Sequence, residues 1–167
     1  MSKIEIGSPG LAGGMVFYDR GDSAGGWRYL EAAPADMETP LRWIAQSYGD
    51  NWRSFPNVDG TGIEIGTGRH NSSLILAVDA DAPAAKACVD YICAGFSDWF
   101  LPSLGELDLM YTNLHRNSLG SFAGNWYWSS SQYAGNINTA WYQYFNDGYQ
   151  DHYYKYSAIA VRAIRAF

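Results

Sequence analysis

The chain has 167 residues, of which 47% are hydrophobic, so we expect one well-buried core and a single domain over residues 1–167. Its net charge of −6 and its scattered Lys and Arg residues exclude nucleic acid as the expected partner, since phosphate binding needs clustered basic groups. Apolar runs stay well short of the roughly 18 residues that a membrane span needs, and residues 1–6 lack an apolar signal core, which fits a cytoplasmic protein or the mature part of a surface protein.

The first half begins with a turn-rich lead, residues 1–14, that contains several glycines. Met15–Tyr18 reads as a strand, and Trp27–Ala32 alternates as a second strand, so the two predict a hairpin. From Pro34 to Gly68, Pro and Gly interrupt every pattern, and we expect the aromatic residues of this segment to pin it to the core. These residues are Trp43, Tyr48, Trp52 and Phe55.

Three short helices are predicted next, as scaffold. Asn71–Val78 has apolar residues at helical spacing, and a second helix should run from Asp81 to Ile92 with Pro83 near its start. Ser103-Leu104-Gly105-Glu106 is a capping box, in which the Ser hydroxyl accepts from the amide three residues on and the Glu reaches back. A third helix should therefore begin at Ser103.

No metal or cofactor site is predicted. Cys88 and Cys93 are five residues apart, without C-x-x-C spacing, and both a disulfide and free thiols stay open. Asp50, Asp59 and Glu64 lack the regular alternation of a calcium loop.

Catalysis is not expected either. His70, His115 and His152 stand in unrelated contexts, and Ser129–Ser131 lacks a G-x-S-x-G elbow. Since a Ser-His-Asp site can assemble from distant residues, a hydrolase remains the remote alternative.

Residues 126–167 hold eight of the thirteen tyrosines. Ala134–Thr139 and Tyr149–Ile159 show no sustained period and are predicted as loops, while Trp141–Phe145 alternates as a strand that ends in a turn at Asp147-Gly148. Tyr with Ser, Gly and Asn is typical of binding loops, because Tyr offers a large amphipathic face at little entropic cost. The alternative is a set of core strand aromatics, which suits Trp141, Gln143 and Phe145 on one face but not the charge-broken run Asp151–Ser157.

Six motifs in order carry a family resemblance: residues 10–19, 26–34, 98–103, 106–107, 127–131 and 161–167. They resemble a bacterial family of C-type-lectin-fold domains that includes the C-terminal domains of collagen-like adhesins and variable proteins of diversity-generating retroelements. The resemblance implies a C-type-lectin-like α+β fold in which the first and last strands pair, short helices pack to one side, and an irregular C-terminal half binds ligand. The Glu-Pro-Asn or Gln-Pro-Asp triplet of calcium-dependent lectins is absent, and Cys88 and Cys93 do not match the cysteine pair of formylglycine-generating enzymes.

The resemblance also implies a source for the unusual composition. In such retroelements, copying of a template repeat randomises adenines, so that Asn codons become Tyr, Asp, His, Ser, Thr, Ile, Ala or Gly codons. Residues 133–139, 149, 151–154 and 156–159 all belong to this reachable set, whereas Gln150 and Lys155 between them do not. We therefore interpret residues 126–167 as a binding region that adenine-targeted mutagenesis diversifies.

The predicted function is a non-catalytic module at the cell surface or outside the cell, with a protein or glycan on another cell or host as its partner. A fixed-specificity adhesin domain that binds polysaccharide is the alternative, and the acidic balance makes anionic glycans less suitable ligands. We assign Trp99, Trp128, Trp141, Phe145 and Arg162 to the frame, by which we mean the structural part of the domain that does not contact the ligand. The candidate contact residues are Tyr133, Asn136, Ile137, Asn138, Tyr142, Tyr144, Tyr149, Asp151, His152, Tyr153, Tyr154, Tyr156, Ser157 and Ile159.

Overall fold

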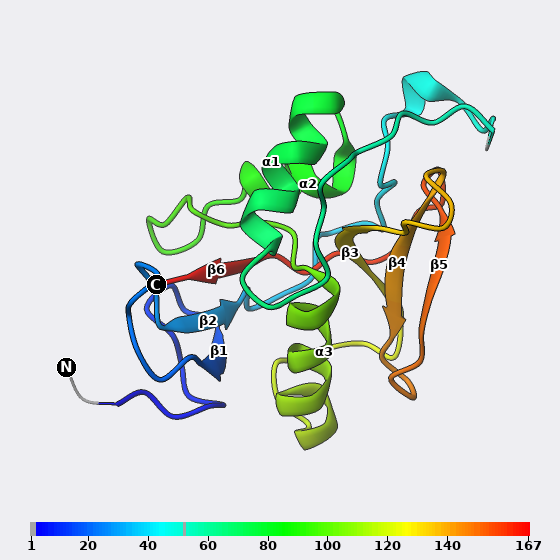
Figure 1. Ribbon diagram of the computed structural model, residues 1–167. Coiled ribbons are helices and arrows are strands. Elements are labelled where there is room, and N and C mark those ends of the chain that lie inside the picture. Colours follow the sequence, from blue (N-terminus) through cyan, green and yellow to red (C-terminus); the bar gives the residue numbers. More distant parts are fainter. Residues whose placement is uncertain (1–2, 52) are drawn as a thin grey trace.

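The computed structural model describes residues 3–51 and 53–167, and its elements are of the α+β class (Figure 1). Two three-stranded antiparallel sheets and three α-helices make up the described part of the chain. The first sheet contains β1 (Met15–Asp19), β2 (Tyr29–Ala32) and β6 (Ile164–Ala166), and the second contains β3 (Trp126–Gln132), β4 (Thr139–Tyr144) and β5 (Gln150–Tyr154). The helices are α1 (Gly68–Val78), α2 (Pro83–Val89) and α3 (Leu104–Asn113), with 3-10 turns η1 (Gln46–Tyr48) and η2 (His115–Asn117).

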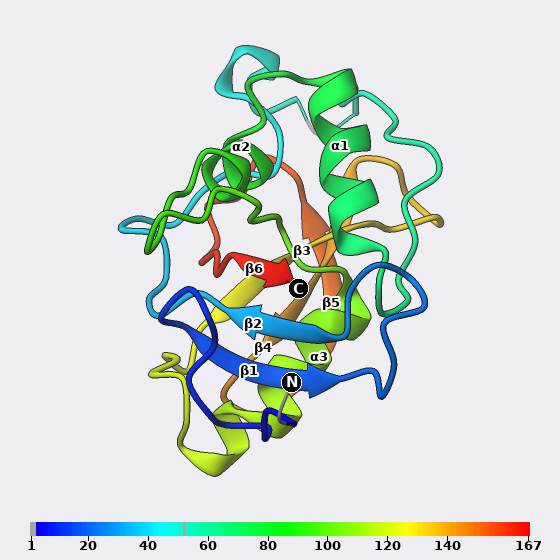
Figure 2. The same cartoon turned by 90° about the vertical axis from the view of Figure 1, so that its left-hand side faces the viewer.

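The first sheet has the order β1-β2-β6, so the predicted hairpin is confirmed and the predicted pairing of first and last strands is wrong. β2 takes the central place because all four of its residues are buried, whereas β1 is partly exposed. Both ends of the described chain nevertheless meet at Tyr29, whose hydroxyl accepts from the Ile4 amide and whose carbonyl accepts from the Phe167 amide. Figure 2 shows this sheet in front, with the second sheet behind it.

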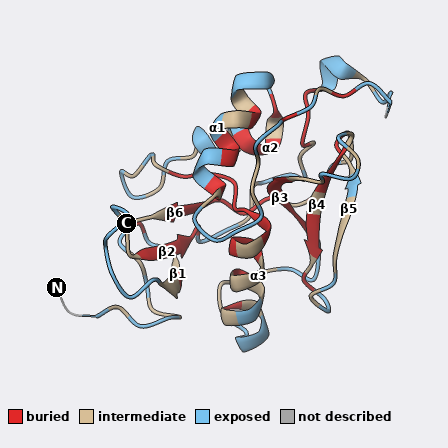
Figure 3. Cartoon of the chain, in the orientation of Figure 1, coloured by how far each residue is buried: buried red, intermediate tan, exposed pale blue. Residues whose placement is uncertain are grey.

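The second sheet has the order β3-β4-β5 and contains a strand that the sequence pattern did not predict. Residues 150–154, expected within a loop, pair with β4 from Gln143↔Gln150 to Thr139↔Tyr154. β5 is an edge strand that has no buried residue, as its pale colours in Figure 3 show. Because neither of its faces is fully buried, its sequence needs no alternation between apolar and polar residues. Residues 134–138 do form a loop, and residues 145–149 form the turn that joins β4 to β5.

The helices agree with the predicted types and differ at their ends. The capping box is confirmed: the Ser103 Oγ accepts from the Glu106 amide at 3.2 Å, and the Glu106 carboxylate accepts from the Ser103 amide at 2.7 Å. Glu106 also accepts from the amide of Gly68, and α1 starts there, three residues before the predicted Asn71. α2 ends at Val89, before the predicted Ile92, because a tight backbone pairing of Cys93 with Phe96 follows.

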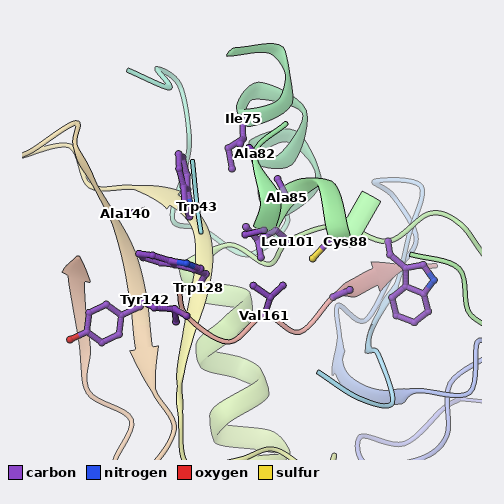
Figure 4. Close-up of a cluster of buried hydrophobic side chains, with 14 of the residues drawn as sticks. Trp43, Ile75, Ala82, Ala85, Cys88, Leu101, Trp128, Ala140, Tyr142 and Val161 are labelled. Carbon is purple, nitrogen blue, oxygen red and sulfur yellow. The ribbon is translucent and has the colours of Figure 1, made fainter. Parts of the chain in front are cut away.

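Two clusters of buried side chains form the core. One lies beneath α1 and α2 and brings Trp43 against the sheet beside Trp128, as Figure 4 shows. The other packs α3 between the two sheets, with Leu107 and Met110 against Tyr127 and Phe145. The predicted frame residues Trp99, Trp128, Phe145 and Arg162 are buried, whereas Trp141 is half-buried.

The predicted core aromatics of the irregular segment behave differently from one another. Trp43 and Phe55 are buried, as predicted. Tyr48 was expected in the core and is 38% exposed, because it lies on η1, which contributes no buried residue. Trp52 lies outside the described residues.

Both cysteines are free thiols: Cys88 is buried among the helices, and the Cys93 thiol donates to the Ala12 carbonyl. Across residues 3–51 and 53–167, no three His, Cys, Asp or Glu side chains gather in a way that would hold a metal ion. In the same residues, every helix is too short or too polar to cross a bilayer.

Candidate binding surface

An exposed group of aromatic rings lies on one face of the second sheet. We call Trp126, Tyr142, Tyr144 and Tyr153 the Trp126 cluster. The Trp126 ring stacks on Tyr142 with centroids 4.8 Å apart and planes at 15°, and it meets Tyr144 and Tyr153 edge-on at 6.2 and 6.0 Å. Alternation along the strands puts these side chains on the same face, since Trp126 pairs with Tyr144 and Trp128 pairs with Tyr142. Trp126 is 41% exposed and Tyr153 42%, so the cluster is open to solvent.

Negative charge borders this cluster. Asp151 lies opposite Tyr142 in the register between β4 and β5, and its side chain is 43% exposed. The Tyr149 hydroxyl, on a side chain that is itself well exposed, donates to Asp151 at 3.4 Å. Burial, followed by the nearby charge of Asp151, raises the pKa of Tyr142 above its ordinary value. The register of the two strands therefore places a negative charge beside Tyr142, in the middle of the cluster.

A second aromatic group, the Tyr133 stack, occupies the opposite face of the same strands and contains Tyr133, Trp141 and His152. Tyr133 and His152 stack with centroids 3.8 Å apart and planes at 10°, and Trp141 meets Tyr133 edge-on at 5.1 Å. The His152 Nδ1 lies 3.1 Å from the Thr139 hydroxyl, which fixes the orientation of the imidazole ring. Each of the three residues is half-exposed.

The chain after β5 is fastened to the frame through Lys155. This side chain is fully buried, and its Nζ donates to the Pro56 carbonyl at 3.0 Å and to the Gln132 Oε1 at 2.7 Å. The ammonium also lies over the Trp43 ring, 4.6 Å from its centroid. Burial lowers the pKa of Lys155 to about 7. The backbone carbonyl of Lys155 accepts from the amides of Trp43 and Ile44, so one residue joins β5 to two distant segments.

The fourteen predicted contact residues fall into three places. The Trp126 cluster and its border hold Tyr142, Tyr144, Tyr149, Asp151 and Tyr153; the Tyr133 stack and neighbouring residues hold Tyr133, His152, Tyr154 and Tyr156; the connecting segments hold Asn136, Ile137, Asn138, Ser157 and Ile159. All except Tyr142 and Ile159 are at least partly exposed. The sheet thus divides the predicted surface between two faces.

Several of these side chains serve the fold. Ile159 is 5% exposed and its backbone pairs with Leu41, so it belongs to the core. Tyr142 is 6% exposed because Trp126 covers it. The Asn136 side chain accepts from the Asn138 amide and stabilises the loop, whereas the Asn138 side chain accepts from the Phe55 amide and ties the loop to a distant segment.

Trp126 is the surface residue that the sequence reasoning missed. Its neighbour two positions on, Trp128, is fully buried, and both lie on the same face of β3. The spacing of two residues could have identified it. Trp126 lies on the same face as Trp128 but at the beginning of the strand, where this face is no longer covered by the core. A cavity of about 460 Å³ opens beside Trp126 and Tyr144, and Pro40 and Ala158 form its other walls.

The serines and histidines that were weighed for catalysis have identified contacts. The Ser129 hydroxyl donates to the Trp141 carbonyl, and the Ser131 hydroxyl donates to the Gly62 carbonyl, while both serines are buried. His115 packs 5.4 Å from Phe145, and His70 lies exposed in the first turn of α1. Both serine hydroxyls therefore bond to backbone carbonyls, one on β4 and one in the segment before α1.

The fold and the site define an α+β domain whose C-terminal sheet displays aromatic side chains. The protein-family model described as the Lcl C-terminal domain matches residues 33–165, and the chain belongs to this family. The match covers all the buried residues of the first core cluster except Ala12, seven of the ten in the second cluster, and the whole of the second sheet. No curated protein matches the sequence.

Proposed function

We propose that this protein is a non-catalytic, adhesin-like binding module with a C-type-lectin-like fold, displayed at the cell surface. Its partner is a protein or glycan on another cell or host, and the second sheet makes the contact. The observation that carries the proposal is the exposure of Trp126 and Tyr153 on paired strands of the second sheet, and of Tyr149 in the turn before β5. Exposed aromatic residues on a rigid support supply contact area at low entropic cost. Membership of the Lcl C-terminal domain family supports the adhesin-like assignment.

We further propose that adenine-targeted mutagenesis diversifies this surface. The positions in the reachable set are mostly exposed or half-exposed, Thr139 and Ile159 being the buried exceptions. Lys155, which is outside the set, is a fully buried anchor, and Gln150, also outside it, bonds to the buried Gln143. Variation at the reachable positions with retention of these two residues would change the surface and preserve the fold.

Sequencing of the gene across a clonal population tests the diversification directly. Substitutions confined to residues 133–139, 149, 151–154 and 156–159, each traceable to a template adenine, are the expected result. An invariant segment contradicts diversification and favours the alternative, a fixed-specificity adhesin that binds polysaccharide. The flat exposed ring of Trp126 favours that alternative, since such rings stack on the apolar faces of sugars.

The binding role itself is tested by replacing Tyr153 and Tyr154 together with alanine. We expect binding to be lost, while the melting temperature stays within a few degrees, because neither side chain belongs to the buried core. Binding is measured on panels of glycans and of cell-surface proteins, and stability is measured by thermal unfolding. Tyr48→Ala is the matched control, since Tyr48 is exposed to a similar degree on η1. A large loss of stability in the double variant would assign these tyrosines to the frame instead.

A further inference from the structure

Several buried basic side chains of this protein make cation–π contacts with aromatic rings in its core. Arg162 lies over Phe122 and Arg165 over Phe96, each 4.1 Å from the ring centroid, and Lys155 lies over Trp43. In each case a cation sits on the electron-rich face of an aromatic ring, where the ring quadrupole attracts it. The frame of this protein therefore uses the same interaction repeatedly.

The Trp126 cluster also contains aromatic rings, but no exposed Lys or Arg lies near them in the sequence. Lys155 is the only Lys or Arg between residues 126 and 160, and it is fully buried against Trp43. The same stretch contains two acids, Asp147 and Asp151. Tyr142 covers one face of the Trp126 ring, and Trp126 as a whole is 41% exposed.

From this arrangement we infer that the Trp126 cluster binds a basic side chain, Arg or Lys, presented by a partner protein. The guanidinium or ammonium lies against the exposed part of the Trp126 ring, and Asp151, opposite Tyr142 on β5, adds negative charge to the cluster. Tyr153, edge-on to Trp126, borders the same site. The cavity beside Trp126 and Tyr144 gives room for the chain that carries the basic residue.

Charge complementarity favours a protein over a glycan here. Neutral sugars bring no cation to the ring, and an anionic glycan would meet Asp151 and a protein of net charge −6. Arginine suits the cluster particularly well, because its planar guanidinium is always charged and stacks on aromatic faces. The inference rests on the proposed binding role of the sheet and specifies the chemistry of its partner.

A pair of tripeptides tests the inference on the unaltered protein. N-acetyl-Gly-Arg-Gly-amide carries the cation, and its citrulline counterpart has nearly the same shape without the charge. The readout is the indole N–H resonance of Trp126 in a nitrogen-15 spectrum, assigned from the peak that Trp126→Phe removes. We expect the arginine peptide to shift this resonance saturably and the citrulline peptide to bind about fivefold more weakly or not at all. Equal shifts with both peptides, or no shift with either, would overturn the inference.

The contribution of the carboxylate is tested with Asp151→Asn, which keeps the side-chain shape. We expect the arginine peptide to bind this variant several-fold more weakly, and added salt to weaken binding to the unaltered protein more than to the variant. Unchanged affinity in Asp151→Asn would contradict the role of Asp151. If both peptide tests fail while partners from the panels still depend on Tyr153 and Tyr154, only this inference is lost and the proposed function stands.

Discussion

The two sheets of this domain differ in their surroundings: charged groups are buried and paired at the first, and aromatic rings are exposed at the second. Around the first sheet, charges are buried and paired: Arg165 is 3% exposed and reaches Glu31 at 3.3 Å and Asp98 at 2.8 Å. Around the second sheet, Trp126 on β3 and Tyr153 on β5 are open to solvent. The charged groups near the first sheet are thus paired within the protein. The exposed rings of the second sheet can still contact other molecules.

The contrast follows from where each sheet lies. β2 is covered on both sides, so its Glu31 is buried and would carry a large desolvation cost without Arg165 and the amides of Ala12 and Gly14. In the described residues, no buried side-chain nitrogen or oxygen lacks a partner. β5 has no buried residue, so its side chains are subject to little of this constraint. Stability should therefore depend steeply on the first region and weakly on the second.

The largest expected effect is on the first region. Arg165→Ala leaves the carboxylate of Glu31 buried without its cation, and we expect a loss of about 3–5 kcal/mol in the free energy of unfolding. Chemical denaturation measures it. Arg116→Ala, at an exposed position of η2, serves as the matched control and should change stability by less than about 0.5 kcal/mol. Similar small losses in both variants would show that the buried ion pairs do not hold the frame.

An intermediate effect is expected where the two regions join, at Lys155. Its pKa is about 7 in the folded chain against an ordinary value of 10.5, so above pH 7 the unfolded state binds more protons. Stability should consequently rise with pH, by up to about 2 kcal/mol between about pH 7 and 8.5. At higher pH the buried Cys88 thiol, whose pKa burial raises, opposes this rise.

The measurement is a series of denaturation midpoints across this pH range, with Lys155→Met as the comparison. The variant removes the titrating group, and its stability should be nearly independent of pH in the same window. A rise of equal size in Lys155→Met would assign the pH dependence to other groups.

The smallest effect is expected on the aromatic face. Tyr149→Ser replaces a side chain that is 60% exposed, and we expect the free energy of unfolding to change by less than about 0.5 kcal/mol. Tyr127→Ser provides the contrast, because Tyr127 is fully buried and its hydroxyl donates to Asp36 at 2.8 Å; a loss of about 3–5 kcal/mol is expected there. Comparable losses at the two tyrosines would remove the distinction between frame and surface.

Local signals predicted the elements they belong to. The capping box at Ser103 and Glu106 appears as expected, because its two hydrogen bonds form within four residues. The hairpin of β1 and β2 likewise needed only alternation and a Gly-rich turn. Local patterns could not predict that β6 pairs with β2, because this pairing depends on which strand is buried on both faces.

The candidate site was predicted in part for the same reason. The tyrosine-rich composition indicated the correct segment, but composition does not say which face of a strand a residue occupies. Trp126 and Ile159 show the two errors: an exposed tryptophan was overlooked at the beginning of a strand, and an isoleucine within an irregular run is buried against Leu41. Tyr48 and Trp43 lie in the same irregular segment and have opposite exposures, which only tertiary packing decides.

The anchoring of Lys155 has a practical consequence for protein engineering. Because this one residue fastens the end of β5 to the frame, the codons around it are suited to combinatorial randomisation. A display library with free choice at residues 149, 151–154 and 156–158, and with Gln150 and Lys155 held constant, would vary the shape and charge of the aromatic face on an unchanged support. The domain would then serve as a small, disulfide-free alternative to antibody fragments for raising new binders.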